Sequence, residues 1–157
     1  MLIYLCGSIE YSPDQGRAWR DEVTCLLHEL GHEVYDPALD EKKDLTEEEV
    51  REFRGWKQTD LPRFQKSIRK IIQYDLDWVE ERCDALVAYW DASAGTGAEQ
   101  GELTAAYRRG VPVYLVTKLP VEKLNGWVLG CASHIFADFE ELREYLAGKR
   151  TNALAYA

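Results

Sequence analysis

Two carboxylates stand in the sequence where they could do acid–base or nucleophilic chemistry. Glu99 follows the glycine-rich run SAGTGA (residues 93–98), and Asp75 opens the segment DLDW. Glycines in such a run let backbone N–H groups approach a ligand, and a helix that begins near Ala98 adds the positive end of its dipole. Cleavage of a glycosidic bond uses a pair of acids, one at the anomeric carbon and one for the leaving group. The spacing is therefore compatible with glycosidic chemistry.

Each of these features also has a purely structural interpretation. Most glycine-rich loops are only tight turns, and an exposed acid in the first turn of a helix stabilises it by well under ~1 kcal/mol. That structural role suits Glu102 better than Glu99, because nothing else in the sequence points to Glu102. We therefore predict that Glu99 and Asp75 form the reactive pair.

Alternating strand and helix patterns place these residues at one edge of a sheet. Continuous or alternating apolar runs predict strands at residues 2–6, 32–37, 84–90 and 111–117, with a weaker fifth strand at 133–139. Helical periodicity predicts helices at residues 17–30, 64–83, 98–109 and 139–148. This alternation implies an α/β fold, an open parallel sheet of about five strands with helices on both faces. Ligands of such sheets collect beyond the carboxyl ends of the strands.

The chain is predicted to be one α/β domain over residues 1–150, followed by a tail at residues 151–157. Residues 38–65 are a long polar excursion with one short helix from Glu47, for which Thr46 and Glu49 fit a capping box. We expect this excursion to be a lid or a surface insertion, and favour the lid because it follows a strand end. The tail is expected to fray unless a neighbouring subunit holds it.

Composition excludes several classes of partner. The net charge of −9 argues against a nucleic acid polymer or an anionic membrane, since both repel an acidic surface. The four cysteines form no CxxC pair and the three histidines have no ligand spacing, so we expect reduced thiols and no metal site. No apolar run approaches the roughly 20 residues that cross a bilayer, and the start lacks a basic leader. We expect a cytoplasmic protein that acts on a small molecule without a cofactor.

Three segments resemble the nucleoside 2-deoxyribosyltransferase family and its relatives, the deoxynucleoside 5′-monophosphate N-hydrolases. These segments are IYLCGSI, YDLDWVEERCDALVAYW and SAGTGAEQG, which begin at Ile3, Tyr74 and Ser93. The resemblance runs from Leu2 to about Gly130 and leaves residues 38–65 uncovered. It implies a flavodoxin-like (Rossmann-like) sheet, a homodimer or larger homo-oligomer with shared sites, and a role in nucleotide salvage. The implied ligands are a nucleoside or nucleotide and a free nucleobase.

The resemblance also implies roles for individual residues. Glu99 corresponds to the nucleophile, Asp75 to the carboxyl group that engages the base, and Tyr4 to a tyrosine whose hydroxyl contacts the nucleophile. Asn125 falls where a neighbouring subunit presents a side chain to the 5′ end of the sugar. The other implied substrate-binding positions belong to two loops: Gly7, Ser8, Ile9, Ser93, Gly95, Thr96 and Gly97.

Positions near the 5′ end of the sugar give opposing indications. Ser93 stands where the transferases usually have an aspartate and the hydrolases a serine, so it favours a 5′-phosphate. Glu10 opposes a phosphate, and Asn125 looks more like the transferases. We expect transfer of deoxyribose from a 2′-deoxyribonucleoside to an acceptor base through a covalent deoxyribosyl-glutamate. The alternative is a 5′-monophosphate N-hydrolase, in which water is the acceptor.

Two further classes of function stay open. A non-catalytic nucleotide-sensing domain would keep the glycine-rich loops but would not need Glu99. A phosphoribohydrolase of the lysine-decarboxylase-like fold also uses a Gly-Thr-x-x-Glu turn, although its fuller PGGxGT run is missing from ASAGTG.

Overall fold

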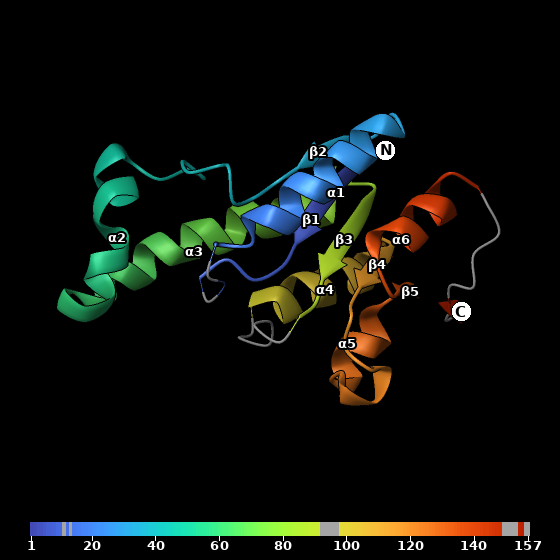
Figure 1. Ribbon diagram of the computed structural model, residues 1–157. Helices are drawn as coiled ribbons and strands as arrows, with labels where there is room; N and C mark the ends of the chain where they lie inside the picture. Colours follow the sequence, from blue (N-terminus) through green and yellow to red (C-terminus); the bar gives the residue numbers. More distant parts are fainter. Residues whose placement is uncertain (11, 13, 92–97, 149–153, 156–157) are drawn as a thin grey trace.

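The computed structural model describes residues 1–10, 12, 14–91, 98–148 and 154–155 (Figure 1). Five parallel strands form a sheet in the order β2-β1-β3-β4-β5. Their bounds are β1 Leu2–Cys6, β2 Glu33–Tyr35, β3 Ala85–Tyr89, β4 Val113–Val116 and β5 His134–Phe136. This order is the flavodoxin-like one, so the predicted open parallel sheet is confirmed.

A sixth strand, β6 (Leu154–Ala155), pairs antiparallel with β5 in the tail of the chain. The prediction that the tail frays is therefore wrong at these two residues.

Helices cover both faces of the sheet, as predicted (Figure 1). They are α1 Arg17–Glu29, α2 Glu47–Thr59, α3 Leu61–Asp77, α4 Ala98–Arg109, α5 Gly126–Cys131 and α6 Phe139–Leu146. A π-helical turn, Trp78–Arg82, continues α3, and a 3₁₀ turn, Val121–Lys123, precedes α5. None of the helices in the described part of the chain is long and apolar enough to cross a membrane.

Strand alternation decides which side chains meet which helices. In β1, Ile3 and Leu5 pack with α1 and α6, whereas Tyr4 and Cys6 pack with α4, α5 and the π-helical turn. All four side chains are almost completely buried. Because successive residues of a strand point to opposite faces, Tyr4 is directed toward α4 and the end of α3. These two helices carry the carboxylates that the sequence singles out.

The excursion after β2 is more ordered than predicted. The predicted helix from Glu47 is present as α2, which continues to Thr59, and α3 already begins at Leu61. Helix α2 lies away from the sheet and against the amino-terminal part of α3 (Figure 1). The predicted capping box is present, since the Thr46 side chain accepts from the Glu49 N–H and Glu49 accepts from the Thr46 N–H. Helix α5, which was not predicted, begins after Asn125, whose side chain caps it.

Candidate active site

A hydrogen bond joins β1 to α4 beside the end of α3. The hydroxyl of the fully buried Tyr4 donates to Oε1 of Glu102 at 2.8 Å. Burial raises the pKa of Glu102 to about 7, and the nearby Asp75 pushes it the same way against hydrogen bonds from Cys6 and Tyr4. A carboxyl group that titrates near neutrality suits proton transfer or nucleophilic attack at physiological pH.

Glu99 lies one helical turn before Glu102, in the first turn of α4, and only 4% of its surface is exposed. Residues three apart on a helix are neighbours on the same face. The backbone carbonyl of Glu99 accepts a weak 3.9 Å contact from the Cys6 thiol, and burial raises the pKa of that thiol. Two buried or half-buried glutamates of α4 therefore face β1, where the sequence singled out only the first.

Asp75, near the end of α3, forms a buried ion pair. Nζ of Lys43 donates to Oδ2 of Asp75 at 2.8 Å, and the two side chains are 9% and 13% exposed. Burial raises the pKa of Asp75, as does the charge of Asp40, while Lys43 opposes the rise. The second oxygen, Oδ1, is buried and has no hydrogen-bond partner among the described residues. This oxygen is suited to accept a hydrogen bond from a ligand.

The segment after β2 is fastened over α3 by tyrosines. The hydroxyls of Tyr35 and Tyr74 donate to Oδ2 of Asp40 at 3.0 and 2.9 Å. Burial acts to raise the pKa of Asp40, but these two hydrogen bonds together with those from the backbone of Lys43 and Lys42 lower the pKa. The ring of Tyr35 stacks on Trp78, with centroids 3.7 Å apart and planes inclined by 11°. Asp40 is therefore a fixed carboxylate that positions the segment carrying Lys43.

The loop after β1 is organised by a buried arginine that the sequence analysis missed. The Arg20 guanidinium donates to the carbonyl oxygens of Gly7, at 2.7 Å, and of Ser8, at 3.4 Å, and it pairs with Asp36 at 3.1 Å. A Cβ atom on Gly7 would lie 2.6 Å from the Trp19 ring, so this position requires glycine. The Ser8 hydroxyl is buried and has no partner among the described residues. The loop is compatible with the substrate contact predicted for Gly7 and Ser8.

The structure brings together only part of the predicted site. Tyr4 and Asp75 lie around Glu102, and we call Tyr4, Lys43, Asp75 and Glu102 the acidic cluster. Ser93, Gly95, Thr96 and Gly97 lie outside the described residues. Within the described part of the chain, no group of three or more acidic, histidine or cysteine side chains could hold a metal ion.

Asn125 has a local role in the folded chain. Its Oδ1 accepts from the backbone N–H of Trp127 at 2.8 Å and so caps α5. The indole of Trp127 donates to the Thr104 hydroxyl on α4 at 2.8 Å, although 62% of the Trp127 surface is exposed. Capping uses the Asn125 oxygen, so the predicted contact of this residue with a partner's substrate stays a prediction.

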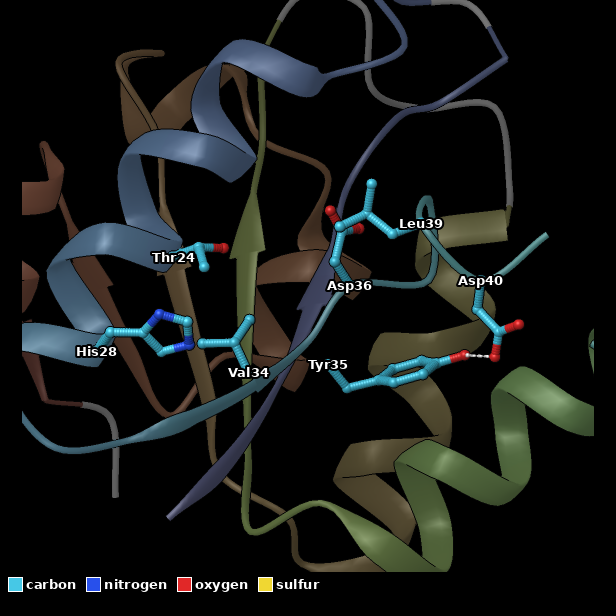
Figure 2. Close-up of a pocket in the computed structure, with 7 residues that line it drawn as sticks. All are labelled: Thr24, His28, Val34, Tyr35, Asp36, Leu39 and Asp40. Carbon is cyan, nitrogen blue, oxygen red and sulfur yellow. Dashed lines mark hydrogen bonds between the residues drawn. The ribbon is translucent and has the colours of Figure 1, made fainter.

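A groove of about 480 Å³ lies between α1, the edge strand β2 and the segment that follows this strand (Figure 2). Its lining residues are Thr24, His28, Val34, Tyr35, Asp36, Leu39 and Asp40. Figure 2 shows the Tyr35 ring directed toward Asp40 and away from Thr24 and His28 of α1. The groove shares no residue with the acidic cluster, so we place the candidate active site at the cluster.

Comparisons with known proteins bear on the fold and on the family of the chain. A family model described as nucleoside 2-deoxyribosyltransferase matches residues 3–142. A solved 2-deoxyribosyltransferase from the psychrotolerant bacterium Bacillus psychrosaccharolyticus is similar over 100% of both chains, with a TM-score of 0.64 and 19% identity. A conserved protein from Enterococcus faecalis V583 is similar over 94% of this chain and 98% of its own, with a TM-score of 0.59 and 16% identity.

A search of curated protein sequences found no match. At these identities the two solved structures establish the fold alone. The family model covers most of the sequence and includes every residue of the acidic cluster. The chain therefore belongs to the nucleoside 2-deoxyribosyltransferase family.

Proposed function

We propose that this protein cleaves the N-glycosidic bond of 2′-deoxyribonucleosides and transfers the deoxyribose to an acceptor nucleobase. Family membership supports a glycosyl-transferring enzyme that binds nucleosides and nucleobases. The observation that carries the chemistry is the hydrogen bond from Tyr4 to Glu102 beside Asp75. In this arrangement Glu102 offers a carboxyl group for the sugar, and Asp75 offers a second one for the base within the same cluster.

The nucleophile in this proposal is a glutamate of α4. The sequence predicts Glu99, but the resemblance also implies that the hydroxyl of a tyrosine contacts the nucleophile. Tyr4 donates to Glu102, and the charge of Asp75 raises the pKa of Glu102. We therefore place Glu102 ahead of Glu99 as the nucleophile, with Glu99 as the competing assignment.

The reaction would proceed by two displacements at C1′ of the sugar. Attack by a carboxylate oxygen forms a C1′–O ester bond while the C1′–N bond breaks, and its electron pair leaves with the base, which takes up a proton. An acceptor base then attacks C1′ through its own nitrogen, loses its proton and releases the carboxylate. Two such steps are each easier than one direct exchange. Water in place of the acceptor base gives the hydrolase.

A nucleoside is the proposed substrate in preference to its 5′-monophosphate. The net charge of −9 and the exposed Glu10 disfavour a dianionic phosphate. Two unit charges 4 Å apart interact by about 4 kcal/mol at the effective dielectric near a protein surface. Lys57 of α2 pairs with Glu10 at 2.9 Å and weakens that repulsion, so the margin between the two substrates is smaller than the sequence suggests.

The test supplies deoxyinosine with free adenine, then deoxyinosine monophosphate alone, and follows the products by chromatography. Deoxyadenosine in the first reaction, with no cleavage in the second, is the expected result. Free hypoxanthine released mainly from the monophosphate would overturn the substrate proposal and identify an N-hydrolase. Binding of both compounds without any turnover would instead identify a nucleotide-sensing domain.

A further inference from the structure

Lys43 is a buried residue in an exposed, charged run. Its neighbours Lys42 and Asp44 are exposed, whereas only 8% of Lys43 is exposed. Lys43 and Asp44 both have left-handed backbones, with φ of 36° and 62°. Such a backbone is unfavourable for residues other than glycine and persists only where the surroundings compensate for it. The turn that directs Lys43 inward therefore has a strained backbone at Lys43 and Asp44.

The position of the Lys43 ammonium group is held from several sides. Its Nζ lies 2.8 Å from Oδ2 of Asp75, and its backbone N–H donates to Oδ1 of Asp40 at 3.4 Å. Asp40 is in turn held by the hydroxyls of Tyr35 and Tyr74. The turn that carries Lys43 is thus fixed to α3 by two contacts, from Lys43 to Asp75 and from the Tyr74 hydroxyl to Asp40, and the ammonium group is fixed relative to Asp75.

This arrangement uses one oxygen of Asp75 and leaves the other available. Oδ2 accepts from Lys43, while Oδ1 is buried without a partner among the described residues. An ammonium group at hydrogen-bond distance favours the ionised carboxylate, which can only accept hydrogen bonds. A nucleobase presents N–H groups as donors along its edge. The free oxygen of an ionised Asp75 is therefore complementary to such an edge.

We propose that Lys43 is a positioning residue of the active site, which holds Asp75 ionised with Oδ1 directed to accept a hydrogen bond from a nucleobase N–H. The choice of ligand rests on the proposed function, whereas the effect of Lys43 on Asp75 does not. Asp75 then recognises the base and does not supply the proton that the leaving base takes up.

Several other groups also face Asp75 and influence its titration. They are Tyr4 of β1, Tyr35 of β2, Asp40 after β2 and Glu102 of α4. Asp40 and Glu102, when ionised, disfavour a negative charge on Asp75, whereas Tyr4 and Tyr35 stay neutral over this range because their pKa values are raised. Lys43 opposes the two acids, and its removal should raise the pKa of Asp75.

The direct test is an NMR titration of the Asp75 carboxyl carbon, assigned by its loss in Asp75→Asn. Lys43→Met should raise the pKa by about one to three pH units, the usual effect of removing an adjacent opposite charge. The matched control Lys42→Met removes an exposed lysine from the same run and should leave the pKa unchanged. An unchanged pKa in Lys43→Met would overturn the proposal. This readout needs no turnover, so failure of the proposed function would not decide it.

Base exchange supplies the second readout. If Asp75 acts as an acceptor, the acidic limb of the pH–rate profile should move to higher pH in Lys43→Met, and Lys43→Arg should restore it. Glu102 also loses the influence of Lys43, so the same substitution is repeated in Asp75→Asn, where most of the shift should disappear. Movement of the basic limb instead would show that Asp75 acts as a proton donor and would overturn the acceptor role.

Folding of the variants is the remaining control. Lys43→Met leaves a buried carboxylate without its partner and could fail to fold. The double variant Lys43→Met/Asp75→Asn removes both charges and should then recover the folded state. If neither the single nor the double variant folds, the role of Lys43 is in the fold and the proposal is wrong.

Discussion

At the scale of single residues, the pKa of Glu102 is set mainly by the burial of its carboxyl group. Burial raises its pKa to about 7, and the Tyr4 hydrogen bond opposes this rise because it favours the charged form. A glutamate nucleophile must be ionised to attack C1′. Activity should therefore fall as the pH drops through about 7.

Replacing Tyr4 with phenylalanine removes that hydrogen bond and little else. The acidic limb of the rate profile should move up by about one pH unit, since the carboxylate loses a donor. The control Tyr107→Phe removes the same hydroxyl from the exposed side of α4, where 62% of the residue is accessible. If the acidic limb shifts equally in both variants, or in neither, the group whose ionisation limits the rate is not Glu102.

Ionisation of Glu102 should increase the activity of the enzyme but decrease the stability of its fold. The folded protein keeps this proton up to pH about 7, while the unfolded chain releases it above the ordinary value of 4.5. The unfolded state then binds fewer protons in this window, so stability is lost as the pH rises from about 4.5 to 7. Glu102→Gln removes that loss and should be more stable than the wild type at pH 8 by up to about 3 kcal/mol, at roughly 1.4 kcal/mol for each pKa unit.

Urea unfolding at pH 8 and at pH 4.5 measures this effect. The gain should be present at pH 8 and absent at pH 4.5, because both proteins then carry a neutral group. The exposed control Glu122→Gln should change little at either pH. A Glu102→Gln variant that is less stable than the wild type at pH 8 would show that burial of this carboxylate is not costly.

At the scale of elements, Glu49 is the main polar link between α2 and α3. It accepts from the Ser67 hydroxyl at 3.1 Å and from Lys70 Nζ at 2.7 Å, besides closing the capping box with Thr46. Lys70 first, and then these other donors, lower the pKa of Glu49 to about 2. Glu49 therefore contributes stability that is complete above pH about 4.5 and is lost as the pH falls through about 2.

Glu49→Gln should accordingly destabilise the protein at pH 7 by about 1–2 kcal/mol. The difference from the wild type should shrink as the pH approaches 2, where both residues are neutral. Glu48→Gln is the matched control, because Glu48 pairs with Arg63 between the same two helices but both side chains are about half exposed. If both variants lose the same free energy of unfolding, the loss comes from surface charge and not from the buried contacts of Glu49.

Prediction from sequence succeeded for elements with a clear apolar pattern and failed for those too short or too polar to show one. The five parallel strands and the long helices follow from buried apolar runs and helical periodicity. Helix α5 has six residues, too few to show a periodic face, and β6 has two. Within residues 38–65, a helix from Glu47 was predicted correctly, but its extent to Thr59 and the start of α3 at Leu61 were missed because the composition is polar.

The candidate site was predicted in part for a similar reason. Tyr4 and Asp75 were identified, and the structure places them beside Glu102. The spacing of Glu102 from Glu99 already put both on one helical face, but the hydrogen bond that Tyr4 donates to Glu102 is a tertiary contact, which the sequence does not show. Lys43 gave no signal, because a lysine in an acidic run usually stays in solvent and its inward turn depends on the backbone at residues 43 and 44.

At the scale of the whole molecule, the predicted oligomer would share its sites through Asn125. Mixing inactive Glu102→Gln subunits with inactive Asn125→Ala subunits should restore part of the activity, since some hybrid sites receive both intact residues. Asn125→Ser is the control, because serine also caps helices but has no amide. If Asn125→Ser is as active as the wild type, the residue serves α5 alone. If subunits exchange and no activity returns, the sites are not shared.

The central claim is that a glutamate of α4 carries the sugar as a covalent ester, and trapping that ester tests it most directly. The wild type is mixed with deoxyinosine without an acceptor base, quenched in acid and analysed by intact mass and peptide mapping. We predict one deoxyribosyl group per site, attached to Glu102, with an equal amount of hypoxanthine released, and no adduct in Glu102→Gln. An adduct on Glu99 would return the nucleophile to the residue that the sequence singled out. Rapid base exchange with no adduct on either glutamate would contradict the account.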